Sequence, residues 1–245
     1  MIADSSIEDG GSVRTPRLID AGLWAGVVAP ILFTGVYLIA GATRVGYDPV
    51  RHQVSLLSLG DGGWVMVAAF LIAGALMVAL AVALHLRLRD GPSALAGPVA
   101  IGLAGVGLVL AGLFSTQPLF GYPPGTPEGM AIDITPASFA HVLGAFLLVF
   151  GLIAATLVLA RRFRREGRAG WAVASLVVGV VVFVFFGASG GGPSGQLLFP
   201  AISGLLQRIS LIAGLGWVAA IALSELRGDP SHHPDRGPAS AGPRR

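Results

Sequence analysis

Six long apolar stretches take up most of this chain and constrain its fold more than any other feature. They are residues 22–43, 64–86, 98–114, 138–160, 170–187 and 201–223. Each is close to the roughly 20 residues that a helix rising about 1.5 Å per residue needs to cross a hydrocarbon core of about 30 Å. Their apolar residues are continuous rather than alternating, which favours helices over the strands of a barrel. The sequence therefore predicts an all-α, polytopic membrane protein, a bundle of six transmembrane helices.

Composition supports this fold class and leaves no room for a separate soluble domain. The chain has 245 residues, of which 54% are hydrophobic and 12% are charged, far fewer charges than in soluble domains. We expect a six-helix domain over residues 21–224. The flanking segments, 1–20 and 225–245, are expected to be disordered tails, since the second is polar and rich in Pro, Gly and Ser.

The arginines predict how the bundle is oriented. All 16 basic residues are Arg. Thirteen lie in the two tails and in the second and fourth connections, namely Arg14, Arg17, Arg87, Arg89, Arg161, Arg162, Arg164, Arg165, Arg168, Arg227, Arg236, Arg244 and Arg245. Only Arg44 and Arg51 lie in connections on the other side. Under the positive-inside rule, we expect both termini to be cytoplasmic and the protein to be a multi-pass protein of the plasma membrane.

Several functional classes are excluded or disfavoured by composition. A sequence pI near 10.2 is common among nucleic-acid-binding proteins, but here the charges flank membrane spans, where orientation and membrane lipids account for them. We therefore expect no nucleic-acid partner. The absence of cysteine excludes disulfides and thiolate chemistry. His85 and His141 lie at opposite ends of their spans, so they cannot be paired axial ligands of a haem. We expect no cofactor and no metal.

The first connection on the arginine-poor side, residues 44–63, is predicted to hold a short amphipathic helix at the membrane surface. Asp48 followed by Pro49 is typical of a helix start, with Asp48 as the N-cap. Apolar and polar residues then follow two different faces at helical spacing (Val50, Val54 and Leu57; His52, Ser55 and Ser58). The segment is either a structural cover for the bundle or a site where His52, Asp48 and Asp61 bind a headgroup or act as acid and base.

Arg208 is the one basic residue inside a predicted span. It lies about seven residues, or roughly 10 Å, from the outer end of the sixth helix. A charge at that depth costs about 2.5 to 3.5 kcal/mol on insertion scales, so Arg208 should face the bundle interior. We expect a carboxylate partner among the acids of the first two outer connections (Asp48, Asp61, Glu128 and Asp133). The alternative is that the side chain extends to the outer interface. Two interpretations stay open, a structural ion pair or a residue that holds an anionic ligand.

The remaining candidate residues lie at a similar depth. His141 is a few residues inside the fourth span, so one polar cluster with His52, Asp61 and Arg208 is geometrically possible. The candidate acid–base residues are therefore His52, Asp61 and His141, and the candidate ligand contacts are Arg208, Asp48 and Ser55. No acid, base and nucleophile set is complete, so the sequence leaves open whether the protein is an enzyme.

Four segments resemble the domain of unknown function 998 family, six-helix membrane proteins of bacteria and archaea. They are GYDPVRHQVSLLSLGDGGWVMVAAF after the first span, GLFSTQP at the end of the third, SFAHVLGAF at the start of the fourth and LLQRI in the sixth. The resemblance covers about residues 20–225 and implies the six-helix fold, but it brings no established activity. Leu56 and Gln117 stand where the resemblance leads us to expect an acidic residue.

Three functional hypotheses follow. The first is a non-catalytic or accessory six-helix membrane protein, because no catalytic set is complete. The second is a lipid-headgroup binding or lipid-modifying protein with a polar site on the outer face. The third is a small-solute transporter, for which the inverted halves or interrupted helices of many carriers are not evident. Membrane lipids are the expected partners, and the sequence identifies no protein partner.

Overall fold

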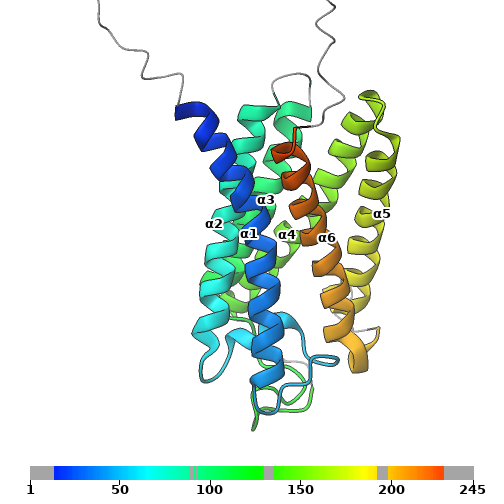
Figure 1. The fold of residues 1–245 in the computed structure, drawn as a ribbon. Helices are drawn as coiled ribbons and strands as arrows, with labels where there is room; N and C mark the ends of the chain where they lie inside the picture. Colours follow the sequence, from blue (N-terminus) through cyan, green and yellow to red (C-terminus); the bar gives the residue numbers. More distant parts are fainter. Residues whose placement is uncertain (1–13, 89–90, 92, 130–134, 192–197, 229–245) are drawn as a thin grey trace, which may run out of the picture.

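Six long helices build the described membrane domain (Figure 1). The computed structural model describes residues 14–88, 91, 93–129, 135–191 and 198–228. The helices are α1 (Arg14–Thr43), α2 (Gly63–Arg87), α3 (Ser93–Leu113), α4 (Pro136–Arg165), α5 (Ala169–Phe186) and α6 (Ser203–Leu226). Three short helical segments lie in the connections, η1 (Val54–Ser58), η2 (Gly187–Gly191) and η3 (Pro200–Ile202).

The predicted all-α bundle of six membrane-spanning helices is confirmed. Each long helix is long and apolar enough to cross a membrane, and the chain is therefore a multi-pass membrane protein. The helices extend beyond the predicted apolar runs, chiefly at their arginine-bearing ends: α1 begins at Arg14 and α4 continues to Arg165. Most of the two predicted tails, residues 1–13 and 229–245, lies outside the described residues.

The helices are arranged as a closed ring in chain order. Each long helix packs against the next, and α1 packs against α6, which closes the ring. The start of α1, the end of α6, and the α2–α3 and α4–α5 connections lie at one end of the bundle (Figure 1). This is the arginine-rich end. The connections α1–α2, α3–α4 and α5–α6 lie at the arginine-poor end.

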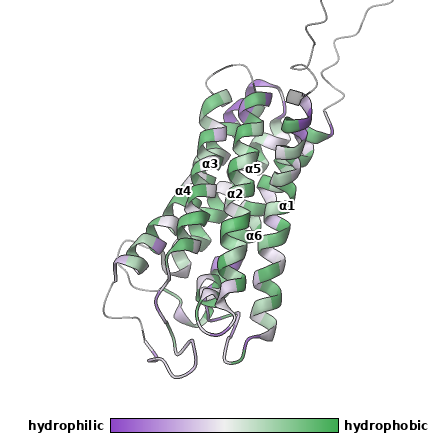
Figure 2. Cartoon of the chain, turned by 90° about the vertical axis from the view of Figure 1, so that its left-hand side faces the viewer, coloured by the Kyte–Doolittle hydropathy of each residue, from purple (hydrophilic) through white to green (hydrophobic). Residues whose placement is uncertain are grey.

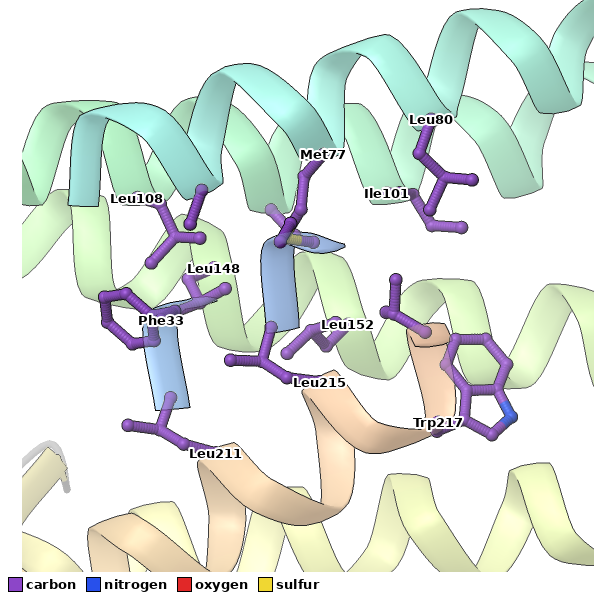
Figure 3. Close-up of a cluster of buried hydrophobic side chains, with 14 of the residues drawn as sticks. Phe33, Met77, Leu80, Ile101, Leu108, Leu148, Leu152, Leu211, Leu215 and Trp217 are labelled. Atoms are coloured by element: carbon purple, nitrogen blue, oxygen red, sulfur yellow. The ribbon is translucent and has the colours of Figure 1, made fainter. Parts of the chain in front are cut away.

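Apolar side chains from α1, α2, α3, α4 and α6 fill the centre of the ring (Figure 3). Phe33 of α1, Met77 of α2 and Leu152 of α4 are each no more than 1% exposed. Leu108, Leu211 and Leu215 surround them. Lipid is as apolar as these side chains, so close van der Waals contact, rather than transfer from water, holds the helices together.

A pair of glycines shows how closely the helices approach. A Cβ atom on Gly144 of α4 would lie 2.7 Å from the carbonyl oxygen of Gly107 on α3, and a Cβ on Gly107 would collide with Gly144 in turn. Only glycine permits this backbone contact at both positions. Hydrophobic residues predominate along the helices, and hydrophilic residues are more frequent towards the two ends of the bundle (Figure 2).

Candidate functional site

Arg208 is the centre of a buried polar cluster at the arginine-poor end of the bundle. It lies in the second turn of α6 and is only 6% exposed. Its Nη1 donates to the carbonyl oxygens of Pro49 at 2.6 Å, His52 at 3.0 Å and Gly204 at 2.9 Å. Its Nη2 donates to the hydroxyl of Tyr47 at 2.6 Å. The guanidinium is therefore bound mainly by the backbone of the α1–α2 connection.

The prediction that a carboxylate pairs with Arg208 is wrong for three of the four candidate acids. Asp48 accepts hydrogen bonds from backbone amides, Glu128 pairs with Arg51, and Asp61 is exposed. The fourth, Asp133, lies outside the described residues. Among the residues that the structure describes, three carbonyl dipoles and one hydroxyl replace the missing anion. Charge-assisted hydrogen bonds of this kind are about twice as strong as neutral ones.

Two aromatic rings lie close to the same guanidinium. The Arg208 Cζ atom is 5.8 Å from the ring centroid of Tyr37 and 5.5 Å from that of Tyr47. Both distances are within the range of a cation–π attraction, which is strengthened when the pair is removed from water. Two buried polar atoms, Arg208 Nε and Tyr37 Oη, have no hydrogen-bond partner among the described residues. The hydroxyl of Thr34 lies near that of Tyr37 without meeting hydrogen-bond geometry.

The start of α6 is capped by the α1–α2 connection. The first amides of a helix have no partner within the helix. Here the amide of Gly204 donates to the carbonyl of Arg51 at 3.1 Å, and that of Leu205 donates to Val50 at 2.9 Å. In return, the side-chain oxygen of Gln207 accepts from the amide of Val54 at 2.7 Å. A Cβ atom on Gly204 would collide with the carbonyl oxygen of His52, so this docking requires glycine.

The helix expected in the α1–α2 connection is shorter than predicted and begins later. Asp48 does act as a cap, since its Oδ1 accepts from the amide of Val50 at 2.8 Å. It caps a single turn, after which the 3₁₀ helix η1 covers Val54–Ser58. Its residues Val54, Ser55, Leu56 and Leu57 are buried. The segment packs against α1, α2 and α6.

His52 is buried, and both of its ring nitrogens are bound. The amide of Asp48 donates to Nδ1 at 2.9 Å. Nδ1 is therefore an acceptor, so the proton of the neutral ring is on Nε2, which donates to the carbonyl of Phe120 at 3.1 Å. The ring lies 5.4 Å from each of the rings of Tyr47 and Tyr122. His52 thus joins the α1–α2 connection to the α3–α4 connection.

Tyr47 connects Arg208 to the turn. Its hydroxyl accepts from Arg208 and lies 2.9 Å from the carbonyl of His52 and 3.0 Å from that of Gln53, to which it donates. Burial raises the pKa of Tyr47 to about 12, although the positive charge of Arg208 acts in the opposite direction. The hydroxyl therefore stays protonated and continues to donate at neutral pH.

A surface ion pair reinforces the link between the two connections. Arg51 Nη2 lies 2.9 Å from Glu128 Oε2, and the Arg51 guanidinium also lies over the ring of Phe120 at 5.4 Å. Both charged side chains are well exposed, so the pair contributes little to stability by itself. It links the α1–α2 connection to the α3–α4 connection a second time, beside the hydrogen bond from His52 to Phe120.

His141 caps the end of α3. Its Nδ1 lies 2.8 Å from the carbonyl of Ala111 and 3.0 Å from that of Phe114. Both partners are acceptors, so Nδ1 carries the proton and satisfies carbonyls that the helix end leaves unpaired. Among the described residues no hydrogen bond joins His141 to Arg208. A row of neighbouring rings, Phe70, Phe33 and Tyr37, lies between them.

The predicted site residues are therefore only partly brought together. His52, Asp48 and Arg208 share one cluster, whereas His141 lies at a separate helix end. Asp61 is exposed, and Ser55 is buried in η1. Leu56, where an acid was expected from the resemblance, is fully buried. The part of the chain that the structure describes holds no group of three or more His, Asp or Glu side chains that could bind a metal.

Sequence reasoning missed three residues of the cluster. Tyr47, Gln53 and Gln207 make its inner hydrogen bonds, including those from Gln53 Nε2 to the carbonyl of Ser189 at 2.7 Å and to Ser203 Oγ at 3.1 Å. The sequence did hold a signal for two of them, because Gln53 and Gln207 directly neighbour the candidate residues His52 and Arg208.

Comparison with known families assigns the chain. Residues 27–224 match the profile of a family described as a protein of unknown function, DUF998. This match begins within α1 and ends within α6, so it includes parts of these two helices and the whole of the four between them. The chain belongs to the DUF998 family. No curated protein and no solved structure matches it significantly.

The segments that carry the resemblance to DUF998 meet in space. Arg208 of LLQRI binds the turn of GYDPVRHQVSLLSLGDGGW. His141 of SFAHVLGAF binds Phe114 of GLFSTQP. In this DUF998 protein the four segments thus form two hydrogen-bonded pairs at the arginine-poor end.

Proposed function

We propose that this DUF998 protein is a non-catalytic, accessory membrane protein whose polar cluster is structural. The observation that carries the proposal is the bonding of His52. A general base needs an available lone pair, but Nδ1 of His52 accepts from Asp48 and Nε2 donates to Phe120. Arg208 is similarly engaged with backbone carbonyls. These groups hold connections together instead of facing a substrate.

A search for lipid turnover tests the proposal. The purified protein, reconstituted in nanodiscs made from a bacterial polar lipid extract, would be incubated and its lipids compared with those of empty nanodiscs by mass spectrometry. We expect no protein-dependent product. A product made by the wild type and lost in Asp61→Asn would overturn the proposal. Asp61 is exposed, so that variant should fold and its loss of activity would be chemical.

One observation favours a second candidate, binding of an anionic lipid headgroup at Arg208. The Nε atom of Arg208 is buried and unpartnered, and none of the described carboxylates offsets its charge. Mass spectrometry of the lipids retained after mild purification would compare wild type with Arg208→Ala and His141→Ala. A lipid lost only in Arg208→Ala supports this candidate. Identical lipid profiles in all three proteins would count against it.

We further propose that the protein lies in the plasma membrane with its arginine-rich end, and hence both termini, in the cytoplasm. The arginine distribution supports this orientation through the positive-inside rule. A C-terminal green fluorescent protein fusion should fluoresce, and an alkaline phosphatase fusion at the same position should be inactive. The reverse pattern would overturn the orientation.

A further inference from the structure

The end of α4 carries a group of arginines that differ from most others in the described chain. Arg44 donates to the carbonyls of Leu57 and Leu59, Arg51 pairs with Glu128, and Arg87 pairs with Glu225. Arg161, Arg164 and Arg165, in contrast, are exposed and make no ion pair with the described residues. They follow one another at i, i+3 and i+4, so they lie on one face of the helix.

The one acid in this segment is already occupied. Glu166 Oε1 binds Arg162 Nε at 2.6 Å, and its Oε2 lies 3.6 Å from Arg168 Nη1. The guanidinium of Arg168 also lies over Phe163, 4.7 Å from the ring centroid. The turn is further fixed by the amide of Arg168, which donates to the carbonyl of Phe163 at 2.8 Å. Glu166 therefore does not neutralise the three exposed arginines, and the turn beneath them is firmly held.

The same face of α4 is apolar where it enters the membrane. Phe150 is 55% exposed and Leu157 is 46% exposed, with exposed Ala154 between them. At 100° per residue, these side chains and the three arginines form one continuous stripe. Eleven residues separate Phe150 from Arg161, which is about 16 Å along the helix. This length is close to half the thickness of a hydrocarbon core of about 30 Å, the depth of one leaflet.

We propose that this stripe is a binding site for one anionic phospholipid of the adjacent leaflet. The acyl chains lie along Phe150, Ala154 and Leu157, and the phosphate is bound by Arg161, Arg164 and Arg165. The arginines lie where the apolar stripe reaches the headgroup region, which is the depth of a lipid phosphate. The carbonyl end of α4 also favours positive side chains there. This site is separate from the Arg208 cluster and independent of the proposed function.

Native mass spectrometry of the detergent-purified protein tests the site. Phosphatidylglycerol and phosphatidylcholine with identical acyl chains would be titrated in parallel. We expect the wild type to retain phosphatidylglycerol preferentially. The double variant Arg161→Gln/Arg165→Gln should bind it about 25-fold more weakly, about five-fold for each arginine. Binding of phosphatidylcholine should not change, and glycerophosphoglycerol, which has no acyl chains, should not displace the lipid.

A matched control separates a site from simple net charge. Arg17→Gln/Arg227→Gln removes two exposed arginines from the same end of the bundle, but neither lies on the α4 stripe. We expect this variant to bind phosphatidylglycerol within two-fold of the wild type. Equal losses in the two double variants would overturn the proposal, as would a wild type that does not distinguish the two lipids. Displacement by the chain-free headgroup would show a phosphate site without the apolar stripe and would also overturn it.

Discussion

Arg208 illustrates how a membrane protein can bury a positive charge next to backbone dipoles. A carboxylate partner would have to lose its own hydration, and that cost often cancels the attraction between the ions. The carbonyls of Pro49 and His52 point at the guanidinium because the turn that contains them is fixed by Asp48 and by the start of α6. The cluster therefore obtains charge-assisted bonds without desolvating a second ion.

Replacing Arg208 should destabilise the protein. Arg208→Gln removes the bonds to Pro49, His52 and Tyr47 and leaves buried acceptors unpaired, at a cost of about 3 kcal/mol in the free energy of unfolding. Unfolding in mixed micelles, followed by circular dichroism as the SDS fraction rises, would measure it. Arg44→Gln is the control, because its bonds to Leu57 and Leu59 are both 3.3 Å long and the side chain is half-buried. Equal effects of the two variants would contradict the central role of Arg208.

Tyr47 should titrate at unusually high pH. Its folded pKa is about 12 against about 10 for an exposed tyrosine, because burial disfavours the phenolate. A raised pKa means that the contribution of Tyr47 to stability is complete below pH 10 and is lost as the pH rises from 10 to 12. The tyrosinate absorbance at 295 nm should show a transition near pH 12 that is missing in Tyr47→Phe. A transition of Tyr47 near pH 10 would show that its hydroxyl is exposed.

At the scale of elements, the α1–α2 connection shows where sequence patterns stop being sufficient. Asp48, Pro49 and the helical spacing of Val50, Val54 and Leu57 predict a helix from Asp48. The structure keeps the cap but not the helix, because the carbonyls from Pro49 to His52 accept from Arg208, Leu205 and Gly204. Carbonyls engaged in this way are not available to the amides four residues later. The groups that compete for these carbonyls lie on α6, about 150 residues further along the chain. The local spacing of apolar residues carries no information about them.

The docking of this connection on α6 depends on Gly204. Gly204→Ala would place a methyl group against the carbonyls of His52 and Pro49, which forces the turn away from α6. We expect a loss of roughly 2 to 3 kcal/mol, of the size found for overpacking a well-packed contact. The matched control on the same helix is Gly216→Ala, whose Cβ meets no atom within 4 Å; it should be neutral or slightly stabilising. Thermal unfolding in one detergent would compare them, and similar melting temperatures would contradict the docking.

At the scale of the whole molecule, the positions of the six helices could be predicted from the sequence, but which helices pack against one another could not. Hydropathy locates each span because lipid requires about 20 apolar residues in a row. The closure of the ring by α1 and α6 depends on side-chain fit between helices far apart in sequence, which apolar composition does not encode. The polar cluster was only partly predictable for the same reason. Arg208 could be identified by its depth in the sixth span, but its contacts with Tyr47 and His52 depend on the packing of α6 against α1.

Single cysteines should report the orientation of the whole bundle, since the native chain has none. Val45→Cys, at a position 87% exposed at the arginine-poor end, should react with a membrane-impermeant maleimide in intact cells. Arg165→Cys, exposed at the arginine-rich end, should react only after permeabilisation. Mass-shift gels would measure the labelling. Labelling of Arg165→Cys in intact cells would show that the orientation is the opposite one, with the phospholipid site of α4 in the outer leaflet.

The bond between Arg208 and Tyr47 joins residues 161 positions apart, and this separation affects how the protein is made. A ribosome adds roughly 5 to 20 residues per second, so Tyr47 emerges about 8 to 30 seconds before its partner. Throughout that interval the α1–α2 connection lacks the Arg208 side chain that binds the carbonyls of Pro49 and His52 in the folded protein. Of the six described helices, α6 is translated after the other five, and it completes the connection that follows α1. A nascent chain that stops before α6 lacks Arg208, so Tyr47 and the carbonyls of the α1–α2 connection are without this partner.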